Sequence, residues 1–511
     1  MRLGLGLLMT MVATYLVLQS SERSVYVTDL LLLDDGGLSL LKLLLGFSVL
    51  ISVVYISFLD WRRALKSVFL ILVFDGAVRK WLLPQASDLI YFFKDFVLLG
   101  AYLRYFFFSE PGERLPLRNN ILNILILIAG SWCIFQAFNP RLGSPIVGLL
   151  GLKAYLFYLP TIWMIPRLFR SQTELYVFIR NHLLLLIPIG LLGVVQFFSP
   201  PDHLINQYIP GRDEPIATFG FAGSRNVRVT STFSYLNSYQ GYLSACFGLL
   251  IPLLNYPQSR LWRNLTFCEL VLAVVNMLMT GSRTPVIVAA GFTLGYFGLR
   301  LLHQPQRALT LLSRLILYSA IALSVIAVVF RPVITVFWKR LSAGTDLAER
   351  IASNFSGPFQ FSAYTHMDGF GIGATHPGAM PLRYLLGLPF GEPLPVELEI
   401  EMDRVALELG PIGFIFWYGL RLYLILVLWL TYLKLKQPFL RDLALAGFLM
   451  HAMTLSNHMV FHHTFSTYYW FYASFVYLLP WLEQVATWQR EQQWLQYYAS
   501  LPPSLPDAPH G

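Results

Sequence analysis

The residues best suited to bind a ligand are arginines in short polar segments between apolar runs. Arg283 stands in MTGSRTPVIVAAG, with almost no loop between two such runs. A charge at a membrane edge is costly unless it has a partner. Pro285 suits the first turn of the next helix, whose free N–H groups would assist the arginine in binding a phosphate. We expect a phosphate site at Arg283; the alternative is an arginine that only anchors the helix end.

A second arginine, Arg228, lies in GSRNVRVTSTFSYLNSYQGYLSA, where hydroxyl and amide side chains are dense. A guanidinium group binds phosphate in a fixed, bidentate geometry. Hydroxyl and amide groups bind sugar hydroxyls or phosphate oxygens. The segment therefore predicts a site for a phosphate or a sugar, and the alternative is that Ser234 or Asn237 simply caps the next helix.

Carboxylates gather in LPVELEIEMDRVALELGPIGF, which leads into an apolar run. If this stretch is helical, spacings of three and four residues place groups from Glu397 to Glu408 on one face. Clustering near arginine can raise the pKa of one carboxyl group, which would suit a general base. The candidates are the clustered carboxylates of this stretch, with Arg404 among them. The alternative is an ion-pair network on the surface before a membrane helix.

Histidines form a third group. His376 lies in GIGATHPGAM, and four others follow the spacing H-x6-H-x3-H-H from His451 to His463. That spacing matches no established metal site, and no carboxylates are interleaved. We expect these rings to line a polar cavity or carry protons, and we predict neither a metal nor another cofactor. The sequence also contains no Walker motif, which argues against direct use of ATP.

These groups must be held by helices in a membrane. Of the 511 residues, 56% are hydrophobic and only 13% are charged. A soluble fold has too little interior for this much apolar surface. The composition excludes a soluble enzyme, a disordered chain and a disulfide scaffold. In a membrane protein, basic residues are distributed unequally between the two sides of the membrane. The net charge of +9 is therefore read as part of that distribution and does not indicate binding to nucleic acid.

Apolar runs of about 20 residues predict an all-α polytopic membrane protein with about 12–14 transmembrane helices. The fourteen candidates are 3–19, 38–59, 64–82, 88–108, 119–138, 146–166, 175–198, 236–255, 264–281, 284–302, 312–330, 409–433, 441–460 and 465–484. Lysine and arginine are concentrated in alternate short loops, which predicts that those loops and both termini are cytoplasmic. Two long loops, 199–235 and 331–408, then fall on the outer side, and long loops commonly carry function.

The sequence resembles the O-antigen ligase and polymerase superfamily of bacterial membrane glycosyltransferases. The similar pieces are RVTSTFSYLNSYQGYLS, TGSRTP, GFGIGATHPG and E-x-E-x-x-R-V-x-x-E-L-G-P-I-G-F, in this order. GAVRKWLLPQASDLIYFFKD also looks like a segment of polymerase-like members. We therefore divide the chain into N-terminal transmembrane helices (1–140), a ligase/polymerase-like core with both outer loops (141–485) and a cytoplasmic tail (486–511).

The resemblance implies a GT-C-like, inverting and metal-independent enzyme in the bacterial inner membrane. Its donor would be a glycan on undecaprenyl diphosphate, presented on the periplasmic face, and its acceptor a glycan or a lipid. Arg228 and Arg283 match arginines thought to hold the donor diphosphate. The expected partners are these substrates and the lipid bilayer, with a chain-length regulator as a further candidate, and no nucleic acid.

One position departs from the ligases. Where they place a histidine, about eleven residues before the glycine of their E-x-G motif, this chain has Glu399. Polymerase-like members often have a glutamate near there, so the resemblance favours a polymerase. Glu399 or Glu401 would be the base, with His376 as the substitute, and Arg404 would orient the carboxylate or bind a second phosphate. A ligase, a transporter or flippase of lipid-linked glycans, and a structural subunit of an export complex are the alternatives.

Overall fold

The computed structural model describes residues 36–110, 112–114, 120–209, 216–219, 226–303, 331–342, 352, 356–360, 365, 367–395 and 400–500. Over these residues the chain is mostly helical and contains no β-strand, only an isolated bridge between Thr218 and Val227. The helices are α3 (Gly36–Leu59), α4 (Trp61–Ala77), α5 (Ser87–Tyr102), α6 (Asn120–Ala137), α7 (Pro145–Leu156), α8 (Thr161–Leu168), α9 (Gln172–Leu183), α10 (Leu186–Phe198), α11 (Leu236–Asn255), α12 (Arg260–Met279), α13 (Arg283–His303), α15 (Arg331–Ser342), α17 (Ala379–Leu386), α18 (Glu401–Lys434), α19 (Pro438–Met453), α20 (His463–Ala473) and α21 (Phe475–Ser500). Short helical turns cover Val78–Leu82, Pro84–Ala86, Leu103–Phe107, Pro140–Leu142 and Leu204–Asn206.

The predicted helical fold class is confirmed for the described part of the chain. Five helical segments there are long and apolar enough to cross a membrane: Pro145–Leu168, Gln172–Phe198, Arg260–Met279, Arg283–Leu302 and Glu401–Lys434. Each overlaps a predicted span. Helices of this length and composition suggest a membrane protein, whereas the full count of 12–14 spans stays a prediction. The candidates 3–19 and 312–330 lie outside the described residues.

Local chemistry sets some boundaries differently from the prediction. The span expected at 409–433 is the second part of α18, because the helix breaks at Gly410, where φ is +68°. The span expected at 441–460 ends earlier, since α19 stops at Met453 and a turn follows. The run 465–484 is divided between α20 and α21, with Ser474 between them.

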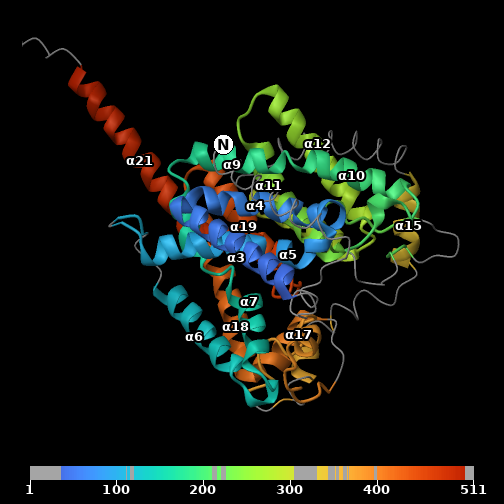
Figure 1. The fold of residues 1–511 in the computed structure, drawn as a ribbon. Helices are drawn as coiled ribbons and strands as arrows, with labels where there is room; N and C mark the ends of the chain where they lie inside the picture. The colour runs from blue at the N-terminus through green and yellow to red at the C-terminus, as the bar shows by residue number, and fades with distance from the viewer. Residues whose placement is uncertain are drawn as a thin grey trace, which may run out of the picture.

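The helices form a body from which one end extends (Figure 1). In that end, α18 packs on α6, α6 on α7, and α17 on α7. Trp132 of α6 donates from its indole N–H to the carbonyl of Leu409, at the break of α18 (2.9 Å). The last turns of α21 project away from the body on another side. The extended end thus brings the 367–378 loop against the first part of α18.

Apolar side chains cover both the interior and much of the outer surface. Leu127 of α6 and Ile415 of α18 are each more than 60% exposed, which suits contact with hydrocarbon better than with water. The interior holds charged side chains as well: Lys94, Glu401 and Glu408 are all fully buried. Burying a charge is costly without partners. The buried charged residues and the groups that compensate them are therefore where a functional site is sought.

Candidate functional site

The loop that carries His376 is docked on the break in α18. Pro411 has no N–H, so the carbonyl of Leu407 has no partner one turn ahead in the helix. The N–H of Phe370 donates to that carbonyl instead (2.8 Å), and the N–H of Gly371 donates to the carbonyl of Glu408 (3.0 Å). Two of the motifs singled out in the sequence, GFGIGATHPG and ELGPIGF, therefore form one unit.

Glu408 holds the next turn of this loop. Its carboxylate accepts hydrogen bonds from the backbone N–H of Thr375 (2.8 Å), the hydroxyl of Thr375 (2.9 Å) and the phenol of Tyr155 (2.9 Å). Several donors compensate a buried carboxylate in the absence of a cation. The position of His376, one residue after Thr375, is thereby fixed.

His376 is half-buried, and its Nδ1 accepts a hydrogen bond from the N–H of Gly378 (2.9 Å). A neutral ring that accepts at Nδ1 carries its proton on Nε2. Burial lowers the pKa of His376 to about 4, and the positive charges of Lys153 and Arg404 act in the same direction. At neutral pH the ring is therefore uncharged and has an N–H to donate.

Glu401 has a different environment. It is fully buried, and its Oε1 pairs with the guanidinium of Arg421 (3.3 Å). Its Oε2 accepts from the backbone N–H of Val460 (2.7 Å) and from that of Met459. Arg421 also donates to the carbonyl of Thr454 (3.0 Å). This arrangement fastens the start of α18 to the turn between α19 and α20, and it favours an anchoring role for Glu401 over that of a base.

Arg404 faces the same turn. Its guanidinium lies over the ring of Phe461, 5.5 Å from the centroid. Its positive charge also lowers the pKa of His458 and of His462, although burial is the larger cause for both. Two predicted site residues, His376 and Arg404, are thus brought to one region, together with histidines of the spaced series.

Arg228 and the turn before Arg283 form a second place where predicted residues gather. The backbone N–H of Arg228 donates to Ala217 (2.8 Å), and its Nε donates to the carbonyl of Thr280 (2.9 Å). Thr280 is the first residue of TGSRTP, and α13 begins at Arg283. The structure therefore places Arg228 against the turn that precedes Arg283. The alternative cap is not formed, because α11 begins after Tyr235 with no side-chain cap.

Segment 75–95 supplies further cations, which the sequence analysis did not assign to the site. Arg79 donates to the hydroxyl of Ser234 (3.1 Å), and Lys80 donates to the carbonyl of Ser231 (2.6 Å). Ser231 has a φ of +49°, which residues other than glycine rarely adopt. Its backbone N–H donates a hydrogen bond to Oε1 of Gln196 (2.7 Å), which helps to hold this conformation. Such strain is concentrated at functional sites.

The same segment contains a buried network of charges. Lys94 of α5 lies 3.5 Å from Asp75 of α4, and His463 lies 3.7 Å from the same carboxylate. Asp95 pairs with Lys153 of α7 (2.9 Å) and accepts from the phenol of Tyr158 (2.6 Å).

The ring of Tyr91 lies between the cations of this network. Lys153 is 4.2 Å, Lys94 4.5 Å and Arg79 5.1 Å from its centroid. His463 meets the ring edge-on at 5.2 Å. The signal for this network was present in the sequence, as charged residues within the predicted spans 64–82 and 88–108. Its partners come from segments far apart in the chain, which no local pattern reveals.

Contacts in this network connect the two places where predicted residues gather. Arg79, which lies over the ring of Tyr91, donates to Ser234 in the segment that follows Arg228, and His463 follows the turn faced by Arg404. Glu399 and Glu397 lie outside the described residues, so the predicted base has no described geometry. The described part of the expected site is therefore a region rich in basic residues and histidines.

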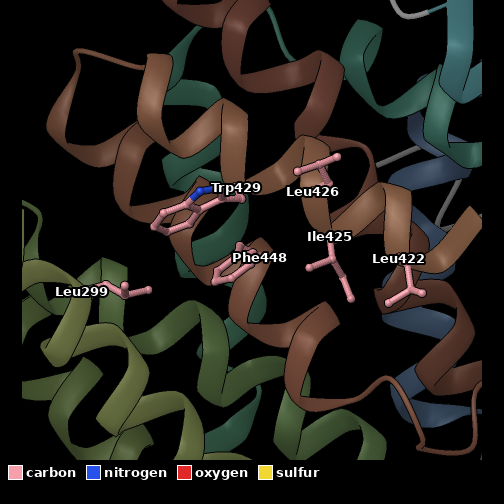
Figure 2. Close-up of a pocket in the computed structure, with 6 residues that line it drawn as sticks. All are labelled: Leu299, Leu422, Ile425, Leu426, Trp429 and Phe448. Atoms are coloured by element: carbon pink, nitrogen blue, oxygen red, sulfur yellow. The ribbon is translucent and has the colours of Figure 1, made fainter. Parts of the chain in front are cut away.

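An apolar groove of about 440 Å³ lies between α13, α18 and α19. Figure 2 shows its lining residues, Leu299, Leu422, Ile425, Leu426, Trp429 and Phe448. Two of its walls belong to segments long and apolar enough to cross a membrane. The lining offers no charged group for catalysis, and it suits contact with hydrocarbon.

Among the described residues, no group of three or more histidine, cysteine, aspartate or glutamate side chains is arranged to hold a metal ion. In the region described above, the arginine and lysine side chains are the groups that can neutralise an anionic ligand. Comparison with known proteins finds no family model and no curated protein that matches the chain.

Proposed function

We propose that the protein is a membrane glycosyltransferase that acts on a lipid-linked glycan, most similar in chemistry to an O-antigen or exopolysaccharide polymerase. The observation that carries the proposal is the hydrogen bond from Arg228 to Thr280, which brings both motif arginines to one turn. Two guanidinium groups at a helix start suit a diphosphate. The donor would be a glycan on undecaprenyl diphosphate at the outer face of a bacterial inner membrane.

In the proposed reaction, Arg228 and Arg283 bind the diphosphate of the donor. A hydroxyl of the acceptor sugar attacks the anomeric carbon from the side opposite the diphosphate. The new C–O bond forms as the bond to the diphosphate breaks, so the configuration is inverted. The lipid diphosphate leaves with the electron pair, and the arginines stabilise its charge.

The proton of the attacking hydroxyl passes to a general base, which we assign to Glu399. Glu401 suits this step less well, because Arg421 and two backbone N–H groups already occupy its carboxylate. His376 carries its proton on Nε2, and therefore suits donation to a substrate oxygen better than proton abstraction. Arg404 would contact a second phosphate or orient the substrate.

The proposal places the protein across the membrane, with about 12–14 helices and both termini in the cytoplasm. The acceptor would be a second glycan or a lipid, with a chain-length regulator as a further partner. Glycan analysis after deletion separates the two related activities. Loss of polymer with single repeat units retained indicates a polymerase, and loss of attachment with free polymer retained indicates a ligase.

The direct test replaces Arg283 with alanine. We expect Arg283→Ala to abolish long-chain polysaccharide while the protein still folds. Arg331→Ala is the control, because Arg331 is another arginine at the first residue of a helix, and this variant should leave chain length unchanged. Normal chain length in Arg283→Ala would contradict the proposal.

The buried network of Asp75, Lys94, Asp95 and Lys153 favours a second candidate, a transporter of lipid-linked glycans. Paired charges inside a helical membrane protein often belong to ion pathways. Membranes containing the protein and a lipid-linked donor, but no ion gradient, separate the two functions. Glycosidic bonds formed under these conditions support the enzyme, and gradient-dependent movement of the donor without bond formation supports the transporter.

A further inference from the structure

Phe461 lies in the turn between α19 and α20 and is only half-buried. Arg404 lies over its ring, and His376 meets the ring at 74° with the centroids 5.4 Å apart. Tyr155 meets it at 86°, 6.3 Å away. Segments from three parts of the chain thus converge on one aromatic ring, which remains partly exposed.

The turn that carries Phe461 also carries neutral hydrogen-bonding groups, which lie near Arg404. The rings of His458 and His462 are 5.4 Å apart, and the amide of Asn237 lies 3.5 Å from Nε2 of His462. Burial lowers the pKa of His458 to about 4 and that of His462 to about 3. An uncharged imidazole offers one donor and one acceptor, the same pair that a hydroxyl group offers.

This combination distinguishes between classes of ligand. A metal site would need carboxylate or additional imidazole ligands at bonding distance, and no such set occurs among the described residues. Arg404 supplies positive charge over this ring, which suits a phosphate beside a bound sugar, whereas the uncharged imidazoles suit the sugar itself. A pyranose ring has an apolar C–H face, which suits the negative face of an aromatic ring. Its edge carries hydroxyls, which suit neutral donors and acceptors.

We propose that Phe461, with His376, His458 and Arg404 around it, forms a subsite for one pyranose ring of the glycan substrate. The inference rests on the proposed function and adds a place where a sugar is bound, apart from the diphosphate site at Arg228. The sugar belongs to either the donor or the acceptor, and kinetics separates the two sources.

The first experiment measures binding and needs no activity. The probe is the repeat-unit oligosaccharide released by mild acid from the lipid-linked glycan of the same cells, titrated calorimetrically into the full-length protein in detergent. We expect Phe461→Leu to weaken binding at least about tenfold and Phe461→Tyr to change it little. Phe390→Leu is the control, because Phe390 is an exposed ring that packs on Tyr384 and is not among the rings that contact Phe461 in the described part of the chain.

His458→Ala gives a second test if the Phe461→Leu protein does not fold, and it should weaken binding in the same direction. The KM values of the same variants, measured with lipid-linked substrates, separate the two sources. A KM above that of the unmodified protein for the acceptor alone assigns the subsite to the acceptor, and one raised for the donor alone assigns it to the donor. No binding to the unmodified protein, or equal binding to Phe461→Leu, His458→Ala and the control, would overturn the inference. A protein that binds the oligosaccharide but forms no glycosidic bond would refute the proposed function and leave the subsite standing.

Discussion

The carboxylate of Glu408 accepts two hydrogen bonds from Thr375, one from its backbone N–H (2.8 Å) and one from its hydroxyl (2.9 Å). The two residues are 33 positions apart, and the contact is buried at the carboxylate. Because His376 follows Thr375 directly, this contact sets where the imidazole lies. The first part of α18 therefore positions a group of the 367–378 loop.

Replacing Glu408 with alanine should destabilise the protein by about 2–3 kcal/mol, because it leaves the hydroxyl of Tyr155 and the donors of Thr375 without their acceptor. Glu408→Gln keeps one carbonyl oxygen for Thr375 and should cost less. Thermal unfolding in detergent measures both changes. Equal stability of Glu408→Ala and the unmodified protein would contradict the assigned role.

The break in α18 should depend on Gly410. Its φ is +68°, and a Cβ there would lie 2.5 Å from the carbonyl oxygen of Met367 and 2.7 Å from the nitrogen of Gly369. Gly410→Ala should therefore cost about 1–3 kcal/mol and loosen the loop that carries His376. The matched control is Gly419→Ala in the same helix, where a Cβ meets nothing within 4 Å. There alanine should be neutral or slightly stabilising.

Hydrogen exchange of the 367–378 loop provides the readout for this pair of variants. Exchange should quicken in Gly410→Ala and stay unchanged in Gly419→Ala. Similar exchange in the two variants would show that the loop does not depend on the break.

The sequence predicted the helices well, because long apolar runs dictate them locally. The predicted span 236–255 has the same limits as α11, and the ELGP sequence marked the place where α18 breaks. The partners of the site residues were not predictable in the same way. Glu401 pairs with Arg421, which lies in an apolar run, and Asp75 pairs with Lys94 of the next helix. Such pairs depend on tertiary packing, which spacing in one segment does not encode.

The pair of Glu401 and Arg421 yields a prediction that separates anchoring from catalysis. Arg421→Met leaves a buried carboxylate without its cation and should cost about 3–5 kcal/mol. The double variant Glu401→Gln/Arg421→Met should recover much of that loss, since neither charge remains. Unfolding of both single variants and the double variant measures the coupling.

Glu401→Gln by itself distinguishes the two roles. If Glu401 anchors the helix, activity should fall only as far as the amount of folded protein falls. A folded but inactive Glu401→Gln protein would instead make this residue the base.

The pH dependence of stability should contain a contribution from His376. The pKa is about 4 in the folded protein, against about 6.5 for an unfolded chain. Between these values the unfolded state binds more protons, so stability should fall as the pH is lowered from about 7 towards 4. His376→Asn keeps an acceptor for the N–H of Gly378 but does not titrate. It should therefore lose about 1–2 kcal/mol less than the unmodified protein between pH 7 and 4.5, a figure reduced for the partial exposure of the ring. Unfolding curves of both proteins over this range measure the difference, and parallel curves would show that His376 is not held in the neutral form by the fold.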